Sequence, residues 1–448
     1  MKIKLKVESL KFKVFIIFFC FSFFFLNLPP SPFSNPPSPP FSKGGMGGFM
    51  AEAKVYIDIT SPAFKKLPIA IQEFSGTSGR EISDIIRDDL IFTGLFSYIE
   101  RAAYIENPSQ PFNPKNWTPI GVEAVVKGSV QEAKDFFTVK VSLYDVFEGK
   151  EILRKEYKAE KEFIRPLCHA IANDIYYTLT GETGIFRSRI SFVAEEKGRK
   201  GIYIIDWDGN RITSTGLKGN IILSPHWSKD GTKLIYSAER NRQWGIYLLD
   251  FINMSEKKVF FSKGTNIAGD FFPEGNDFIF SSSKDGTPDL YVKNLKENNI
   301  TKLTSFYGIE VSPAVSPDGK YIAFVSDKGG SPQIYTMYTD GSNVRRITFK
   351  GSYNTSPSWS PKGDRIVFAG RQGTNQIFTV NPDGTGLTQL TTRGDNEVPS
   401  FSPDGRYITF SSDRDGVKGI YIMRANGESQ KRITPKNLRA SGPRWSPN

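Results

Sequence analysis

Cysteine and histidine are scarce in this sequence, which has two of each among its 448 residues. Cys20 lies in an apolar stretch near the N-terminus, so Cys168 is left without a second cysteine in the rest of the chain. A single thiol forms no internal disulfide, and the few Cys and His residues lack the spacing of a zinc site. The composition therefore predicts neither a disulfide framework nor a metal-bound fold.

Motifs for catalysis or cofactor binding are also missing. The chain has no Gly-x-Ser-x-Gly nucleophile elbow, no P-loop and no Gly-x-Gly-x-x-Gly turn. Cys168 and His169 are neighbours on a predicted helix, so they point to different faces and form no catalytic dyad. His226 falls in a repeat described below, and we interpret it as a packing or loop residue. We therefore expect no enzymatic activity, no cofactor and no bound metal.

The N-terminus has the pattern of an export signal. Several lysines precede an apolar run over residues 14–28, which is shorter than the roughly 20 residues of a membrane-spanning helix. Residues 29–40 are rich in Pro and Ser, and Ala51-Glu52-Ala53 fits a cleavage site. Residues 1–53 are thus predicted to be a signal peptide and spacer, with a mature start at Lys54. An uncleaved membrane anchor is the alternative.

A repeat fills the remainder of the chain from about residue 185. Its clearest copies read Ser-Pro-x-(Trp/Phe/Val)-Ser-Pro-Asp-Gly followed by an apolar strand. The aromatic or Val position recurs every 42–44 residues, at Trp227, Phe271, Val315, Trp359, Phe401 and Trp445. A period of roughly 40–50 residues with several β-runs per unit is typical of a β-propeller, because a single blade cannot bury its own faces.

The two ends of the repeat indicate how the propeller closes. The chain stops just after Trp445, where the next strand of a blade should follow, and that missing strand stands at the beginning, at 189–192. We expect the last segment to form the inner strand of the first blade, with Trp445 packed near Ile190 and Phe192. This closure removes an edge that would otherwise invite aggregation. The prediction is a six-bladed propeller over residues 185–448.

Residues 54–184 lack the repeat and predict a separate α/β domain. Apolar or alternating runs at 55–59, 67–74, 96–99, 124–130, 137–143 and 152–157 predict strands. Ser78 and Glu81 form a candidate capping box for a helix that stops at Gly94, and a second helix runs from about residue 164 to Gly181. The mixed order of these elements favours a mixed sheet with helices on one face.

The net charge of +11 is unevenly distributed. Acidic side chains slightly outnumber basic ones over residues 54–184, whereas the repeat region is strongly basic. This asymmetry favours an anionic partner or surface, and a lysine-rich proteome explains it equally well. Nucleic acid is not expected as a partner, because the chain has neither a Lys/Arg cluster nor a reading motif.

The loops before the inner strands are the candidate partner-binding surface. Five positions ahead of the key aromatic or Val stand Ile222, Asn266, Glu310, Asn354, Asn396 and Ala440. All inner strands start on the same face, so these residues are expected to ring one mouth of the central channel, where loops on a rigid scaffold often bind. Plain turn preference is the alternative for the polar ones. The recurring Asp-Gly pairs are interpreted as turns rather than calcium ligands.

On these residues the chain resembles the TolB family, the periplasmic propeller proteins of the Tol–Pal envelope system. The Ser-Pro-x-Trp-Ser-Pro-Asp-Gly repeats are shared with many bacterial propellers, and the first domain is more specific. Matching segments lie at 55–59, 68–71, 94–96, 121–128 and 186–190. The resemblance extends from about Lys54 to Asn448.

The resemblance implies a non-enzymatic, monomeric adaptor in the periplasm. Its partners would be TolA and Pal, through which it would be peripheral to the membrane, and other outer-membrane proteins. It implies a role in outer-membrane integrity and in envelope constriction at cell division. TolA would contact the mature N-terminal segment up to about Lys65, beginning with Lys54, Val55, Tyr56, Ile57, Asp58 and Ile59. Pal would dock at the channel mouth opposite the tight turns, at Thr265, Asn266, Ala268, Glu310, Val311, Asn354 and Asn396.

Two other functions remain open at this point. The propeller could present substrate to a separate peptidase, or it could bind an anionic glycan through its basic surface.

Overall fold

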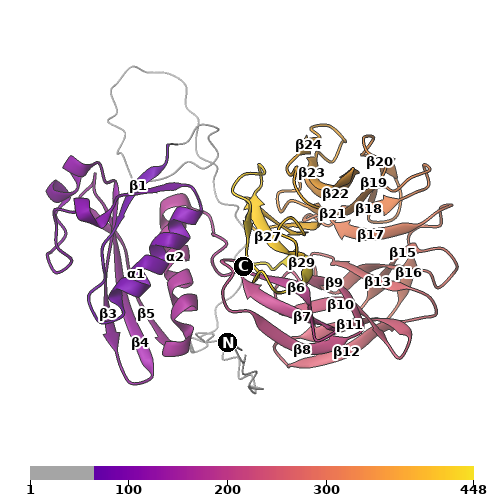
Figure 1. Ribbon diagram of the computed structural model, residues 1–448, viewed down its shortest axis with the longest axis horizontal. Helices are drawn as coiled ribbons and strands as arrows, with labels where there is room; N and C mark the ends of the chain where they lie inside the picture. Colours follow the sequence, from indigo (N-terminus) through magenta and orange to yellow (C-terminus); the bar gives the residue numbers. More distant parts are fainter. Residues whose placement is uncertain (1–64) are drawn as a thin grey trace, which may run out of the picture. The chain divides into compact units, whose positions relative to one another are not determined.

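The computed structural model describes residues 65–448 (Figure 1), so the predicted strand at 55–59 and the segments before it lie outside the described residues. The described part contains one five-stranded sheet and six four-stranded sheets. The five-stranded sheet and its helices come first in the chain, and the six smaller sheets follow.

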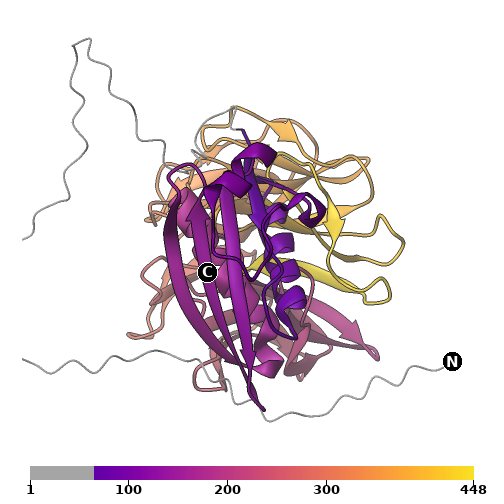
Figure 2. The same cartoon turned by 90° about the vertical axis from the view of Figure 1, so that its left-hand side faces the viewer.

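The first domain is a mixed sheet with two helices. Its strands are β1 (Leu67–Ile71), β2 (Phe96–Tyr98), β3 (Ala124–Glu132), β4 (Phe136–Asp145) and β5 (Lys150–Glu160), in the order β2-β1-β3-β4-β5. β1 pairs parallel with β2 and β3, and the β3-β4-β5 part is antiparallel (Figure 2). The helices α1 (Gly79–Phe92) and α2 (Ile164–Thr180) share one face of this sheet (Figure 1). These elements confirm the predicted fold class.

The helix ends follow the sequence only in part. Gly94 and Gly181 both adopt φ of +73° beyond the ends of α1 and α2, the left-handed conformation that glycine favours at a helix C-terminus. The predicted capping box is wrong, because the Ser78 side chain makes no capping hydrogen bond. Its backbone N–H instead donates to Glu132 Oε1 at 2.9 Å, so a carboxylate distant in sequence takes the place of Glu81.

Each of the six small sheets is one propeller blade. Going outward from the inner strand, their strands are β29 (Ala440–Trp445), β6 (Arg189–Glu196), β7 (Arg199–Asp206) and β8 (Thr213–Gly219); β9 (Ile221–Trp227), β10 (Lys233–Arg240), β11 (Gln243–Asp250) and β12 (Ser255–Phe261); β13 (Asn266–Phe271), β14 (Asp277–Ser282), β15 (Asp289–Asn294) and β16 (Ile300–Lys302); β17 (Glu310–Val315), β18 (Tyr321–Ser326), β19 (Gln333–Tyr338) and β20 (Arg345–Arg346); β21 (Asn354–Trp359), β22 (Ile366–Gln372), β23 (Thr374–Val380) and β24 (Thr388–Gln389); β25 (Asn396–Phe401), β26 (Tyr407–Ser412), β27 (Gly419–Arg424) and β28 (Lys431–Arg432).

The Ser-Pro-Asp-Gly segments form the tight turns that follow the inner strands. In one of them, Gly319 has φ of +70° and its N–H donates to Ser316 O at 2.9 Å, while Ser316 Oγ donates to Asp318 Oδ1 at 2.6 Å. The divergent copy that starts at Phe272 keeps the same backbone, because Gly275 also has positive φ and donates to Phe272 O at 2.9 Å. The glycine therefore fixes this turn even where the serine is lost.

The last strand closes the ring as predicted. β29 pairs antiparallel with β6, with Trp445 opposite Ile190 (Figure 1). The Trp445 indole Nε1–H donates to Ser188 Oγ at 2.7 Å, and its ring packs in the same buried cluster as Ile190 and Phe192. Blade one is thus assembled from the beginning and the end of the propeller sequence.

Closure by β29 predicts a strong dependence on the C-terminal residues. A chain truncated after Ser441 loses most of β29 and exposes the β6 edge, so we expect it to aggregate or to be degraded. The milder Trp445→Ala substitution removes a buried indole and should lower the free energy of unfolding by roughly 3–5 kcal/mol. Chemical denaturation of both variants checks this. A soluble truncated chain that melts cooperatively near the native temperature would contradict the closure.

Candidate functional site

The inner strands carry a bulge that sets the direction of the next side chain. Five of them place a residue in the left-handed region, with φ between 50° and 61°, directly before a proline: Ser224, Ser312, Ser356, Val398 and Gly442. Positive φ is unfavourable for a β-branched residue such as Val398, so the surrounding sheet must hold it there. A bulge re-aims the residues that follow it. In each of these five strands, the bulged residue lies two positions before the residue that directly precedes the key aromatic or Val.

The residue type at that position varies among the blades. The six equivalent residues are His226, Asp270, Ala314, Ser358, Ser400 and Arg444. All but Ala314 line one cavity of about 460 Å³, to which the tight turns of all six blades also contribute. Because every blade takes part, we place this cavity, here called the turn-side cavity, at the tight-turn end of the central channel.

His226 and Asp270 form a buried pair in the turn-side cavity. His226 Nδ1 lies 2.5 Å from Asp270 Oδ1, and Asp270 Oδ2 accepts the Val315 N–H at 3.1 Å. Burial and the nearby charge of Arg444 lower the pKa of His226 below its ordinary value. His226 is buried, as its interpretation as a packing residue predicts, but it lies in the strand β9 and not in a loop, and it also lines the cavity. The sequence signal was a charged or titratable residue in a slot that other blades fill with Ala or Ser.

Arg444 also lines this cavity but has few protein partners. Its Nη1–H donates to Pro399 O at 3.2 Å, while Nε is buried with no acceptor among the described residues. Burial lowers the pKa of Arg444, and the charge of Asp270 opposes this, but no ion pair of Arg444 is found among the described residues. Arg444 was not among the site residues predicted from the sequence, because it precedes Trp445 in the segment assigned to closure.

The predicted ring at the opposite mouth is mostly buried. Asn266, Ala268, Glu310, Asn354 and Asn396 are all buried, whereas Thr265 is exposed and Val311 half-buried. The amides join neighbouring blades: Asn354 Nδ2 donates to Gln333 Oε1 at 2.7 Å, and Asn396 Nδ2 donates to Gln376 Oε1 at 2.9 Å. These side chains therefore stabilise the loops and do not line the mouth, while the role of this mouth in binding stays a prediction.

One blade junction has an acid where three others have an asparagine, Asn266, Asn354 and Asn396. Glu310 replaces the asparagine, and Asp289 stands at the position of Gln333. Ser326 Oγ donates to Glu310 Oε1 at 2.9 Å, and Glu310 Oε2 is buried without a partner in the described chain. Burial, opposed by the Ser326 hydrogen bond and assisted by the charge of Asp289, raises the pKa of Glu310 to about 7. Two carboxyl groups this close cannot readily both ionise.

The same mouth exposes aromatic and basic residues that sequence reasoning missed. Tyr307 is 98% and Phe349 70% exposed, and the Arg371 guanidinium lies 4.7 Å from the Tyr353 ring centroid. Equivalent loops expose the cations Lys263, Lys350, Arg393 and Lys436. The sequence did contain a signal for these cations. A Lys-Gly, Arg-Gly or Lys-Asn dipeptide recurs eight or nine residues before the key aromatic. We call Thr265, Tyr307, Phe349, Tyr353 and these four cations the loop-side mouth.

Cys168 and His169 have separate environments. Cys168 is fully buried, and burial raises the pKa of its thiol. His169 Nδ1 instead lies 2.7 Å from Asp89 Oδ2. His169, Asp206 and Asp208 come close enough to surround an ion. The Arg165 guanidinium already pairs with Asp208 at 2.5 Å, and the Arg211 guanidinium pairs with Asp206 at 2.7 Å. This cluster is therefore charge-paired by the protein itself.

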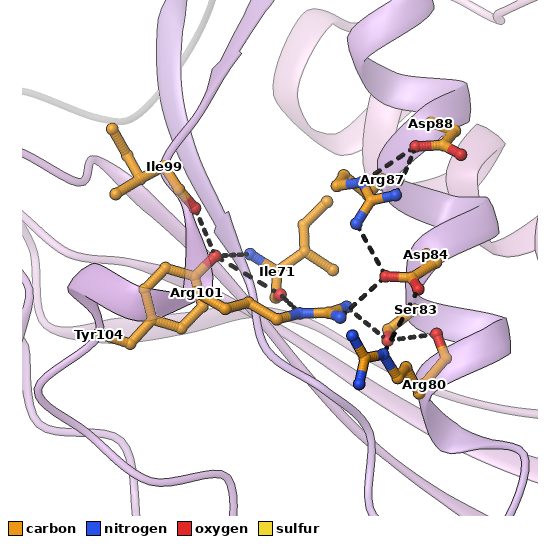
Figure 3. A network of polar contacts seen from close by, with 9 residues as sticks. All are labelled: Ile71, Arg80, Ser83, Asp84, Arg87, Asp88, Ile99, Arg101 and Tyr104. Atoms are coloured by element: carbon orange, nitrogen blue, oxygen red, sulfur yellow. Dashed lines mark hydrogen bonds and ion pairs between the residues drawn. The ribbon is translucent and has the colours of Figure 1, made fainter.

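A further polar network fastens β1 to α1 in the first domain (Figure 3). The Arg101 guanidinium donates to Ile71 O and Ser83 Oγ and pairs with Asp84 Oδ1 at 2.8 Å. The Tyr104 hydroxyl donates to Ile99 O at 2.8 Å and accepts the Ile71 N–H at 3.0 Å. Each Arg101 nitrogen has a protein partner, so this network is structural and contrasts with the sparsely partnered Arg444.

These features define a class of protein: an α/β domain joined to a six-bladed propeller whose channel offers a distinct surface at each end. Family models agree, with the TolB amino-terminal domain matching residues 55–152 and the TolB beta propeller domain matching residues 176–448. The chain belongs to the TolB family. Within residues 65–448, no helix combines the length and the apolar character needed to cross a membrane.

Comparison with individual proteins supports this assignment. The Tol-Pal system protein TolB of Geobacter sulfurreducens is 54% identical, covering 88% of this chain and 93% of its own. The Tol-Pal system protein TolB of Desulfosudis oleivorans is 36% identical, over 41% of this chain and 45% of its own. The crystal structure of TolB from Acinetobacter baumannii superposes with a TM-score of 0.76 at 27% identity, covering 88% of this chain and all of that one.

The acid at the blade junction predicts a pH-dependent stability. The pKa of Glu310 is raised above its ordinary 4.5, so its stabilising contribution is present below that value and is lost as the pH rises through about 7. Glu310→Gln cannot ionise, and we expect it to raise the free energy of unfolding at about pH 8 by roughly 1 kcal/mol, with little effect at about pH 5. Denaturation at both pH values measures this.

Glu274→Gln is the matched control, because Glu274 is an exposed carboxylate in the tight turn of the neighbouring blade. It should change stability little at either pH. If Glu310→Gln behaves like this control, Glu310 does not carry the raised pKa.

Proposed function

We propose that this protein is a non-enzymatic periplasmic adaptor of the Tol–Pal system, which binds Pal and TolA to maintain the outer membrane and to support constriction at division. The observation that carries the proposal is the pairing of both TolB family domains in one chain, at 54% identity to a Tol-Pal system protein. The export signal predicted from the N-terminal sequence supports a periplasmic location.

The loop-side mouth is the proposed Pal surface. It presents exposed aromatic rings beside cations on a rigid scaffold, and Tyr, Trp and Arg are the residues that dominate binding energy in protein interfaces. The Tyr307 ring is almost wholly exposed, and the Phe349 ring is mostly exposed beside the Arg346 guanidinium. Exposed aromatic rings of this kind are typical of interaction sites when they gather on one face.

The Pal proposal is tested with Tyr307→Ala and Thr265→Arg. Both positions are exposed, so the changes should leave stability within about 0.5 kcal/mol while weakening binding to the soluble domain of Pal by about tenfold or more. Arginine at Ala268 or Asn354 is unsuitable for this purpose, because those side chains are buried and their replacement would disturb the fold. Calorimetric titration measures the affinity.

Tyr338→Ala is the matched control, since Tyr338 is an exposed tyrosine beside the tight turns. It should bind Pal as the unmodified chain does. Unchanged affinity for both Tyr307→Ala and Thr265→Arg would mean that Pal docks elsewhere.

The TolA proposal concerns the segment before β1. Residues 54–65 precede the first described strand, and a short segment that docks or is released carries an ordering cost of about 1 kcal/mol or more per residue, comparable to what it recovers on binding. We expect deletion of residues 54–65 to abolish TolA binding while leaving thermal unfolding and Pal binding unchanged. Retention of TolA by the shortened chain would contradict the proposal.

A pull-down from envelope extracts separates this function from the two alternatives. Recovery of Pal with the unmodified chain, and its loss with Tyr307→Ala, supports the adaptor. Recovery of a peptidase or of glycan in place of Pal would overturn it.

A further inference from the structure

The turn-side cavity has charged and small residues on opposite halves. Arg444, His226 and Asp270 come from β29, β9 and β13, which belong to three consecutive blades. The remaining three blades hold Ala314, Ser358 and Ser400 at the equivalent positions, and of these only the two serines line the cavity. Large polar groups therefore face the space that the small residues leave. A volume of about 460 Å³ falls in the range of roughly 300–1,000 Å³ that sites for small ligands occupy.

The guanidinium of Arg444 is the group in this cavity with unused hydrogen-bonding capacity. It has five N–H donors, and the protein satisfies it through the Pro399 carbonyl alone, leaving Nε buried without an acceptor. The nearest acid, Asp270, is engaged by His226 and by the Val315 N–H. The Arg444 side chain is half-buried and its Nε is fully enclosed, and a charge in such a setting is costly unless something pairs with it. The complementary group is a planar anion, which a guanidinium can hold through two parallel hydrogen bonds.

A second cation stands at the entrance. Five of the six tight turns place a proline at the cavity rim, at Pro273, Pro317, Pro361, Pro403 and Pro447. The remaining turn has Lys229, whose Nζ lies 3.5 Å from Pro317 O of another blade. The lining thus contains two permanent cations and one carboxylate, beside a histidine whose pKa is lowered. Its net charge of one positive unit matches a monoanion, while the fixed Asp270 disfavours a more highly charged ligand such as a phosphate.

The walls of the cavity are apolar. Trp227, Phe271, Trp359, Phe401 and Trp445 surround it together with the rim prolines. Such walls recognise an apolar body, and the arginine at the base fixes the orientation of its acidic end.

We propose that the turn-side cavity binds an organic monocarboxylate with an apolar body, with the carboxylate on the Arg444 guanidinium. Two sources share this chemistry: the free C-terminus of a peptide that ends in an apolar residue, and a small free aromatic acid. The site lies at the other end of the channel from the loop-side mouth, and it stands independently of the proposed Pal and TolA binding.

Binding of an anion should be coupled to His226. The titratable and charged groups that face His226 are Asp270 and Arg444, with Lys229 at the rim. A bound carboxylate offsets the charge of Arg444, which is one cause of the lowered pKa of His226, so the imidazole takes up a proton more readily in the complex. The chain has two histidines, so the His226 ring resonances in a proton NMR spectrum are assigned by comparison with His226→Gln.

The test uses the full mature chain and three probes. N-acetyl-Ala-Ala-Phe with a free carboxylate is compared with the same peptide as its C-terminal amide and with benzoate. Calorimetry gives affinities, and the pH titration of the His226 resonance reports the site. We expect the free acid to bind, the amide to bind at least about tenfold more weakly, and the His226 midpoint to rise in the complex. Benzoate that binds as tightly as the peptide identifies the small acid as the ligand, whereas much weaker benzoate binding identifies the peptide C-terminus.

Two variants use residues that other blades already hold in the same slot. Arg444→Ser installs the residue found at Ser358 and Ser400, and Lys229→Pro restores the rim proline. We expect Arg444→Ser to weaken binding of the free acid by about tenfold or more and to abolish the difference between acid and amide, since charge-assisted hydrogen bonds to the carboxylate are lost. Lys229→Pro should weaken binding a few-fold. Asp270→Asn keeps the acceptor for the Val315 N–H and should strengthen binding of the free acid, because it removes a negative charge from the cavity.

The proposal fails if the free acid and the amide bind equally well, if none of the probes binds at millimolar concentration, or if Arg444→Ser retains the affinity of the unmodified chain. If Arg444→Ser does not fold, as judged by thermal unfolding, the comparison of acid with amide and the effect of Asp270→Asn decide the question on the remaining chains.

Discussion

The pairing of β29 with β6 is the interaction on which the propeller depends. It joins two segments of the chain that are separated by the other five blades, and among the sheets of residues 65–448 its sheet alone contains both ends of the repeat region. β29 also carries Arg444 and Trp445, so the same strand that closes the ring supplies part of the turn-side cavity. Stability and the candidate binding site are therefore linked through six residues.

Two of the blades are tied to the preceding blade by the same indole contact. Trp227 Nε1–H donates to Arg444 O at 3.2 Å and Trp359 Nε1–H donates to Ala314 O at 3.1 Å, so an indole ties each of these strands to the preceding blade. Such contacts fix the backbone and leave the side chain at the preceding position free to vary. Arg444, His226 and Asp270 occur at that free position, and Lys229 occurs in a turn that elsewhere holds proline. In a repeat protein, departures from the repeat indicate where packing is not the constraint.

The sequence predicted the fold well because the fold is made of local patterns. The 42–44-residue period and the Asp-Gly turns predicted the blades. The strand that should follow the last segment stands at 189–192, and this predicted the closure. The environment of single polar side chains was not predictable in the same way. Asn354 lies at the start of an inner strand, where it could face the channel or the neighbouring blade, and only the partner Gln333 decides between them. Ser78 likewise depends on Glu132, which no local pattern indicates.

Closure by the last strand also sets an order of events during synthesis. The β6, β7 and β8 strands are made before any other part of the propeller, and the strand that completes their blade is made after all the rest. Until then the inner edge of β6 remains unpaired, and such an edge is prone to pair with another chain. Contacts between residues this far apart in sequence also form slowly. The first blade to be made is consequently the last to be finished, and the interval between the two is the period in which the nascent protein most needs protection from its neighbours.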